Sequence, residues 1–266
     1  MPDVWSTVAD LDPTMQRRLG DVLETRGADP QQRAMRMVFL DSIPFPDGST
    51  VLEVGCGTGV LTRQLAAHPS VAEVVGVDLA GSLLERAREL SVDHPQIEYL
   101  EGDARDLPVD DDDFDVVVFD STLSHVPDVD KALTETARVL RPGGRLAAFD
   151  GDYATATVAL GDQDPLQECV NAMMANSVND RYVMRRLASV ARRHGFEVEH
   201  FQSHGFVDTS DDGYMVTVVE RGIDLLLGNG QIGEGTATAL RAEVTRRAEL
   251  GLFFGHVAYL SLIARL

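Results

Sequence analysis

Short apolar runs alternate with amphipathic helical patterns through the middle of the chain. The apolar runs end at turn-forming residues, which favours strands, and the stretches between them carry apolar residues at helical spacing. The expected strands are 51–54, 71–77, 97–100, 114–119 and 145–149; the expected helices are 60–67, 82–90 with Ser82 as its N-cap, and 132–140. This alternation predicts a doubly wound α/β fold, with a mostly parallel sheet covered by helices on both faces.

Helical patterns flank the alternation on both sides. Residues 1–48 form an amphipathic lead-in that closes with the turn-like stretch 43–48. After residue 150 the expected helices are 164–176, 182–194, 214–227 and 236–250, and the expected strands are 197–206 and 253–266. We expect a single domain over residues 1–266: an N-terminal helical lid (1–48), a cofactor-binding core (49–150), and substrate-side helices with the C-terminal strands (151–266).

Composition excludes some classes of partner. The formal net charge of −20 argues against binding to a nucleic-acid backbone or an anionic membrane surface. The N-terminus has no apolar signal segment and no apolar run is long enough to span a membrane, which predicts a soluble, cytoplasmic protein. Cys56 and Cys169 are far apart in the sequence, and we expect both to be free thiols. The oligomeric state, monomer or homodimer, stays open.

The glycine loop after the first expected strand carries the chemistry. Three glycines at alternate positions, in Gly55-Cys56-Gly57-Thr58-Gly59, allow a tight turn whose backbone can lie against a ligand. The helix that follows presents free N–H groups to that ligand. The spacing is one residue tighter than the G-x-G-x-x-G fingerprint of dinucleotide sites. Glu53 would also repel a pyrophosphate, so an NAD(P)-dependent oxidoreductase is disfavoured.

This loop resembles the first motif of the class I S-adenosylmethionine (SAM)-dependent methyltransferases, and further family motifs follow at the expected intervals over residues 50–150. The nearest resemblance is to ubiquinone- and menaquinone-biosynthesis and natural-product methyltransferases. It implies a Rossmann-like, seven-stranded sheet with an antiparallel last strand and a helical insert before it. It also implies SAM as cofactor, with Asp78 on the ribose and Asp103 at the adenine amino edge. The implied cofactor-binding residues are Glu53, Gly55, Cys56, Gly57, Gly59, Asp78, Leu79, Asp103, Ala104 and Ser121.

His125 is the candidate catalytic residue. It follows strand 114–119 in a His-Val-Pro-Asp sequence that many relatives share, beside the expected position of the methyl group. It can act as the general base for a hydroxyl acceptor or line the cofactor site structurally. No metal site is predicted, although Asp120, Asp150 and Asp152 superficially allow one.

Substrate-binding candidates come from both ends of the chain. Asp150 and Asp152 are expected to leave the fifth strand at its carboxyl end, where they either orient a substrate or cap the next segment. Trp5 can form part of a lid or belong to a disordered end. The candidates are Trp5, Asp152, Tyr214 and His256.

The predicted reaction is methyl transfer from SAM to a small, partly apolar metabolite of secondary metabolism. Oxygen is the favoured acceptor atom, with carbon or nitrogen as the other choices. The alternative function is cyclisation or isomerisation with bound SAM and without methyl transfer. In either case the partner is a small molecule.

Overall fold

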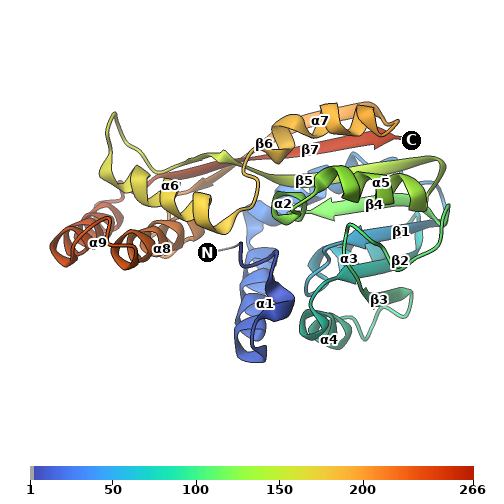
Figure 1. Ribbon diagram of the computed structural model, residues 1–266, viewed down its shortest axis with the longest axis horizontal. Coiled ribbons are helices and arrows are strands. Elements are labelled where there is room, and N and C mark those ends of the chain that lie inside the picture. The colour runs from blue at the N-terminus through green and yellow to red at the C-terminus, as the bar shows by residue number, and fades with distance from the viewer. Residues whose placement is uncertain (1–2) are drawn as a thin grey trace.

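The computed structural model describes residues 3–266, in which seven strands form one sheet with helices on both faces (Figure 1). The strand order is β3-β2-β1-β4-β5-β7-β6, and only β7 runs antiparallel to its neighbours in this described sheet. The strands are β1 (Ser49–Val54), β2 (Val71–Asp78), β3 (Ile97–Glu101), β4 (Phe114–Asp120), β5 (Leu140–Thr157), β6 (Glu197–Asp208) and β7 (Gly255–Arg265). The predicted fold class is confirmed.

The helices lie where the apolar periodicity predicted them, within a few residues at each end. They are α1 (Pro13–Ala28), α2 (Pro30–Asp41), α3 (Val60–Ala66), α4 (Gly81–Leu90), α5 (Val129–Val139), α6 (Pro165–Ser177), α7 (Val183–Arg193), α8 (Tyr214–Gly228) and α9 (Glu234–Glu249). Two short 3-10 turns, Val8–Asp10 and Leu123–His125, complete the described elements. No helix in residues 3–266 is long and apolar enough to cross a membrane.

The central strands are buried on both faces, which agrees with the four apolar residues 116–119 of β4. Because side chains alternate along a strand, Val116 and Val118 enter one core with residues of α2, α3, α6 and α8. Val117 and Phe119 enter the opposite core with residues of α5 and α7. The same alternation turns Glu53 of β1 away from the core that holds Leu52, and its carboxylate contacts α3 through Thr62.

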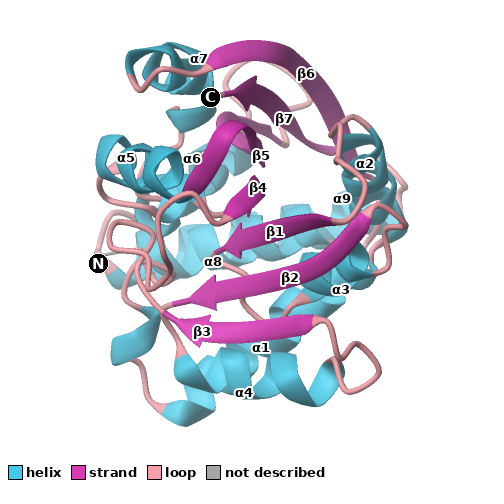
Figure 2. Ribbon diagram, turned by 90° about the vertical axis from the view of Figure 1, so that its right-hand side faces the viewer, coloured by secondary structure: helices cyan, strands magenta, loops and turns pink. Residues whose placement is uncertain are grey.

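The two N-terminal helices have strong start signals. The side chain of Asp12 accepts hydrogen bonds from two backbone N–H groups of α1, and that of Asp29 accepts one from α2. Proline occupies the first position of each helix, where no N–H partner is needed. Helix α1 packs against α3 and α4 at the cofactor end of the sheet, so the lead-in covers the glycine loop (Figure 2).

Three local expectations were wrong. Ser82 does not cap α4; its N-cap is Ala80, and the Ser82 hydroxyl donates to Gln16 of α1 instead. The fifth strand does not begin at residue 145; β5 begins at Leu140 and includes Gly143, which adopts a φ of +82°. Strand β5 does not end near residue 149, because antiparallel pairing with β7 continues it past Asp150 and Asp152 to Thr157.

The C-terminal part extends the sheet beyond the carboxyl end of β4 (Figure 1). Helices α6, α8 and α9 pack on one another beside the long strands β5, β6 and β7, at the left of Figure 1. Helices α8 and α9 are inserted between β6 and β7, which confirms the predicted helical insert before the last strand. One cavity is lined by residues at the carboxyl ends of β1, β2 and β4, by α1 and by the N-terminal segment.

Candidate active site

The glycine loop has the backbone that its spacing predicted. Gly55, Gly57 and Gly59 all have positive φ, at +76°, +54° and +77°. A side chain on any of them would be strained in that conformation. It would also collide with a neighbour: a Cβ on Gly55 would lie 2.3 Å from Thr122, and one on Gly59 would lie 2.2 Å from the Tyr99 hydroxyl. Glycine is therefore required at these positions for the loop to close tightly over β4 and β3.

Asp78, at the end of β2, holds the loop in place. One carboxylate oxygen accepts the Gly57 N–H at 2.8 Å and the other accepts the Ala80 N–H at 3.0 Å. Burial raises the pKa of the Asp78 carboxyl, although these backbone donors act in the opposite direction. A carboxylate has about four acceptor positions, so Asp78 retains capacity for hydroxyl groups of a ligand at the cavity wall.

Glu53 is buried beneath the loop, with 2% of its surface exposed. The Thr62 hydroxyl donates to it at 2.5 Å. Burial, reinforced by the negative charges of Asp120 and Asp78, raises the pKa of the Glu53 carboxyl from 4.5 to about 8, while the Thr62 bond opposes the shift. The side chain is therefore mainly protonated at neutral pH. A cationic ligand at the loop would favour the ionised form.

Asp103 already has a cationic partner. Arg105 donates to both of its carboxylate oxygens, at 3.0 Å from Nε and 2.6 Å from Nη2. Hydrogen bonding to Arg105 holds the pKa of Asp103 below its ordinary value. The family resemblance implies that Asp103 accepts from an adenine amino group. Arg105 would compete with that group for the carboxylate oxygens.

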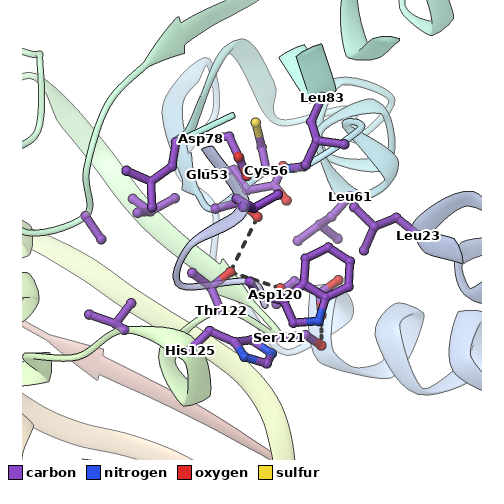
Figure 3. A pocket seen from close by; sticks show the side chains of 18 of the residues that line it. Leu23, Glu53, Cys56, Leu61, Asp78, Leu83, Asp120, Ser121, Thr122 and His125 are labelled. Carbon is purple, nitrogen blue, oxygen red and sulfur yellow. Dashed lines mark hydrogen bonds between the residues drawn. The ribbon is translucent and has the colours of Figure 1, made fainter. Parts of the chain in front are cut away.

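The carboxyl end of β4 joins the loop to the N-terminal helices. Ser121 has a φ of +56°, which few residues other than glycine adopt, and its N–H donates to Phe149 of β5 at 2.7 Å. Its hydroxyl lies 2.9 Å from Arg26 of α1. The neighbouring Asp120 forms an ion pair with Arg36 of α2 at 2.9 Å. In Figure 3, Asp120, Ser121 and Thr122 lie between the loop residues and His125.

His125 is held by an acid from the other end of the chain. Its Nδ1 lies 2.5 Å from Asp3, and Asp3 also accepts the Asn179 N–H at 3.0 Å. Within residues 3–266 the structure gives Nε2 of His125 no hydrogen-bond partner. The preceding residue, Ser124, donates both its N–H and its hydroxyl to the buried Asp150. The ring of His125 is held by Asp3, and the backbone before it is held by the bonds between Ser124 and Asp150.

The glycine loop, the ends of β2 and β4, and His125 line one cavity of about 170 Å3. The predicted site residues in its wall are Trp5, Glu53, Gly55, Cys56, Gly57, Asp78, Leu79, Asp103, Ala104, Ser121 and His125. Apolar side chains from α1, α3 and α4, including Leu23, Leu61 and Leu83, complete it. Cys56 and Cys169 are free and buried, as expected, and burial raises the pKa of both thiols.

Four predicted site residues are not part of the cavity wall. Gly59 packs against Tyr99 behind the loop, and Asp152 is paired with Arg185 of α7 at 2.8 Å. Tyr214 begins α8 and packs edge-on to Phe206, and His256 lies in β7 opposite Val207 and Thr157. Long-range folding decided these positions, and local sequence carries no signal for them.

Sequence reasoning missed three residues of the N-terminal segment, Asp3, Arg26 and Arg36. They belong to a lead-in that was interpreted only through its apolar periodicity, and no motif surrounds them. Asp120, Asp150 and Asp152 have separate partners, Arg36, Ser124 and Arg185. The described residues hold no group of three or more side chains arranged to ligate a metal ion.

Sequence comparisons match the part of the chain that contains the glycine loop to known methyltransferases. The family model described as a methyltransferase domain matches residues 52–148. A 2-phytyl-1,4-naphtoquinone methyltransferase of Thermosynechococcus vestitus is 40% identical over 43% of this chain and 52% of that protein. An uncharacterized 37.1 kDa protein in a Streptomyces fradiae transposon is 33% identical over 62% of this chain and 48% of that protein. The chain thus spans about half the length of the curated relatives it matches.

Solved structures share the fold at low sequence identity. A putative methyltransferase from Bacillus halodurans has a TM-score of 0.63 at 21% identity, covering 86% of this chain and 97% of that one. The [4+2]-cyclase SpnF has a TM-score of 0.59 at 19% identity, covering 100% of this chain and 97% of that one. At these identities the likeness concerns the fold alone.

The residues present fit the cofactor of this family. Gly55 and Gly57 present bare backbone to the cavity, and Asp78 keeps acceptor capacity beside them. At the same cavity wall, the Thr58 hydroxyl is buried without a hydrogen-bond partner in the described structure, as is Nη1 of Arg36. Such unsatisfied groups are expected where a polar ligand binds. Residues 52–148 thus match a methyltransferase domain, and the residues that line the cavity fit S-adenosylmethionine as the cofactor of such a domain.

Proposed function

We propose that this protein transfers the methyl group of SAM to an oxygen atom of a small, partly apolar metabolite. The observation that carries the proposal is the single cavity in which the glycine loop and Asp78 face the ring of His125. SAM supplies an electrophilic methyl group on a sulfonium. The protein then has to orient the acceptor, exclude water and accept a proton.

His125 is the general base in this proposal. Its Nδ1 side is occupied by Asp3, a carboxylate that can only accept a hydrogen bond when ionised, so the ring proton lies on Nδ1. Nε2 is then the basic nitrogen and can accept a proton from an acceptor hydroxyl. Asp3 acts through His125 and is a positioning residue.

The cavity wall supports a partly apolar acceptor. Leu23 and Leu61 come from α1 and α3, and Trp5 lies in the N-terminal segment with its ring centroid 6.2 Å from that of His125. We assign residues 3–48 the role of a lid over the core 49–150, with 151–266 forming the substrate side and the C-terminal strands. Residues 1 and 2 of the predicted lid lie outside the described residues.

Incubation with methyl-labelled SAM and a panel of hydroxylated aromatic acceptors tests the function. Naphthohydroquinones belong in the panel because a relative is named as a naphthoquinone methyltransferase. We expect labelled product from the wild-type protein and a loss of turnover of about 100-fold in His125→Gln, with S-adenosylhomocysteine (SAH) affinity unchanged. His94→Gln, a change at a partly exposed histidine outside the cavity wall, is the matched control.

Two results would contradict this proposal. Product that forms without transfer of label would favour cyclisation or isomerisation with bound SAM. Equal losses of turnover and SAH affinity in His125→Gln would assign the histidine to the cofactor site instead of to catalysis.

A further inference from the structure

Arg26 of α1 is a cation in the cavity wall without an acidic partner of its own. Within residues 3–266 no carboxylate lies within ion-pair distance of its guanidinium. Its hydrogen bonds both come from Nη2, to the Ser121 hydroxyl at 2.9 Å and to the Tyr259 hydroxyl at 3.0 Å. Nε is buried and has no partner. A charge that is removed from water is costly unless an opposite charge compensates it.

The acids of the cavity wall near Arg26 and Arg36 do not compensate both charges. Asp120 is paired with Arg36, a residue with 4% of its side-chain surface exposed, at 2.9 Å. Burial raises the pKa of Glu53 to about 8, so this side chain is mainly neutral at pH 7. Two arginines therefore face one ionised carboxylate at this end of the cavity. Arg36 also has a buried Nη1 without a partner in the described structure.

The surroundings of Arg26 place it toward the acceptor. One of its partners, Ser121, lies at the carboxyl end of β4 near His125, and the other, Tyr259, belongs to β7 on the C-terminal side. The guanidinium carbon lies 5.6 Å from the centroid of the Tyr259 ring, which itself stacks on Phe149. Tyr259 and Phe149 are fully buried, so they hold Arg26 in place, and the N–H groups of Arg26 that they leave unused suit an anionic molecule in the cavity.

The cofactor does not neutralise this region. SAM carries two positive groups, its sulfonium and its ammonium, against one carboxylate, so its binding adds net positive charge. An anionic acceptor would compensate both that charge and Arg26.

We propose that the acceptor carries a carboxylate, bound by the free N–H groups of Arg26 next to the hydroxyl that is methylated. The acceptor class is then a hydroxylated aromatic or unsaturated carboxylic acid. This inference rests on the proposed function, because it assumes that the acceptor occupies the cavity between Ser121 and His125. Arg26 selects the acceptor and takes no part in proton transfer.

A matched pair of probes tests the carboxylate site without relying on turnover. The affinities of 1-hydroxy-2-naphthoate and its neutral amide, 1-hydroxy-2-naphthamide, are measured calorimetrically on the protein saturated with SAH. We expect the wild-type protein to bind the carboxylate at least tenfold more tightly than the amide. Arg26→Gln should abolish this preference, and Arg26→Lys should retain part of it because the charge remains and the planar fork is lost. Arg18→Gln, an exposed change on the same helix, should keep the full preference.

The cofactor's own carboxylate is the competing source of the anion. Affinity for SAH and for 5′-methylthioadenosine, which lacks the amino-acid part, is therefore measured on both Arg26 variants. A tenfold loss for SAH with no loss for methylthioadenosine would assign Arg26 to the cofactor and overturn the inference. The absence of any wild-type preference for the carboxylate would also overturn it. A protein that prefers the carboxylate but never transfers labelled methyl would refute the proposed function and leave the carboxylate site standing.

Discussion

Replacing Glu53 by Gln should stabilise the protein, and the stabilisation should grow with pH. The carboxyl is buried at 2% exposure with a pKa of about 8, whereas its ordinary value is 4.5. Between these two pH values the unfolded chain releases the Glu53 proton and the folded chain keeps it. The folded state therefore loses stability as the pH rises through this window, and its stability is highest below it. Gln has nearly the same shape, can still accept the Thr62 hydrogen bond, and does not titrate.

The expected magnitude follows from the width of that window. At about 1.4 kcal/mol per pH unit, wild-type Glu53 costs about 3 kcal/mol at pH 7 and about 5 kcal/mol above pH 8. The free energy of unfolding of Glu53→Gln minus that of wild type should therefore be near zero at pH 4.5. It should then rise to those values and stay constant above pH 8.

Urea unfolding of both proteins at several pH values between 4.5 and 9 provides the measurement. Glu73→Gln, an exposed change on β2, is the matched control and should show no such trend. A stability difference that is independent of pH, or one that shrinks as the pH rises, would refute the assignment of a buried, mainly protonated Glu53. The same substitution should weaken SAH binding, because the variant cannot become anionic beside the ammonium group of the ligand.

Three further substitutions test other parts of the site. Asp78→Asn should weaken SAH binding by about 10- to 100-fold, because the amide has fewer acceptor positions; unchanged affinity in calorimetry would mean that the ribose lies elsewhere. Asp3→Asn should lower kcat about tenfold on any acceptor that is turned over, with SAH affinity unchanged and rescue by Asp3→Glu, because it frees the His125 ring to rotate or change tautomer. A fall in SAH affinity equal to that in kcat would instead indicate a structural role. Gly59→Ala should lower the free energy of unfolding by about 1–3 kcal/mol, because its φ is +77° and the new Cβ meets the Tyr99 hydroxyl; thermal melting that matches wild type would contradict this packing.

The sequence by itself determined the architecture and the cofactor end of the site. Alternation along β1 and β4 fixes which side chains enter each core, since a strand turns successive residues to opposite faces. The glycine spacing fixes the loop, since only glycine adopts those φ values without strain. The position of Asp78 beside the loop follows from its place at the end of β2. These features depend on residues close together in the chain, which is why local patterns predicted them.

Only the tertiary structure decided which residues surround His125 and complete the cavity. Asp3 contacts His125 across 122 positions of sequence, and Arg26 contacts Tyr259 across 233. Asp152 was predicted at the end of a strand, but pairing between β5 and β7 continues past it, and it binds Arg185 of α7. These contacts arise from how helices and strands pack, and they leave no periodicity or spacing in the sequence. The glycine loop is therefore encoded locally, whereas the rest of the cavity wall exists only once distant segments have been brought together.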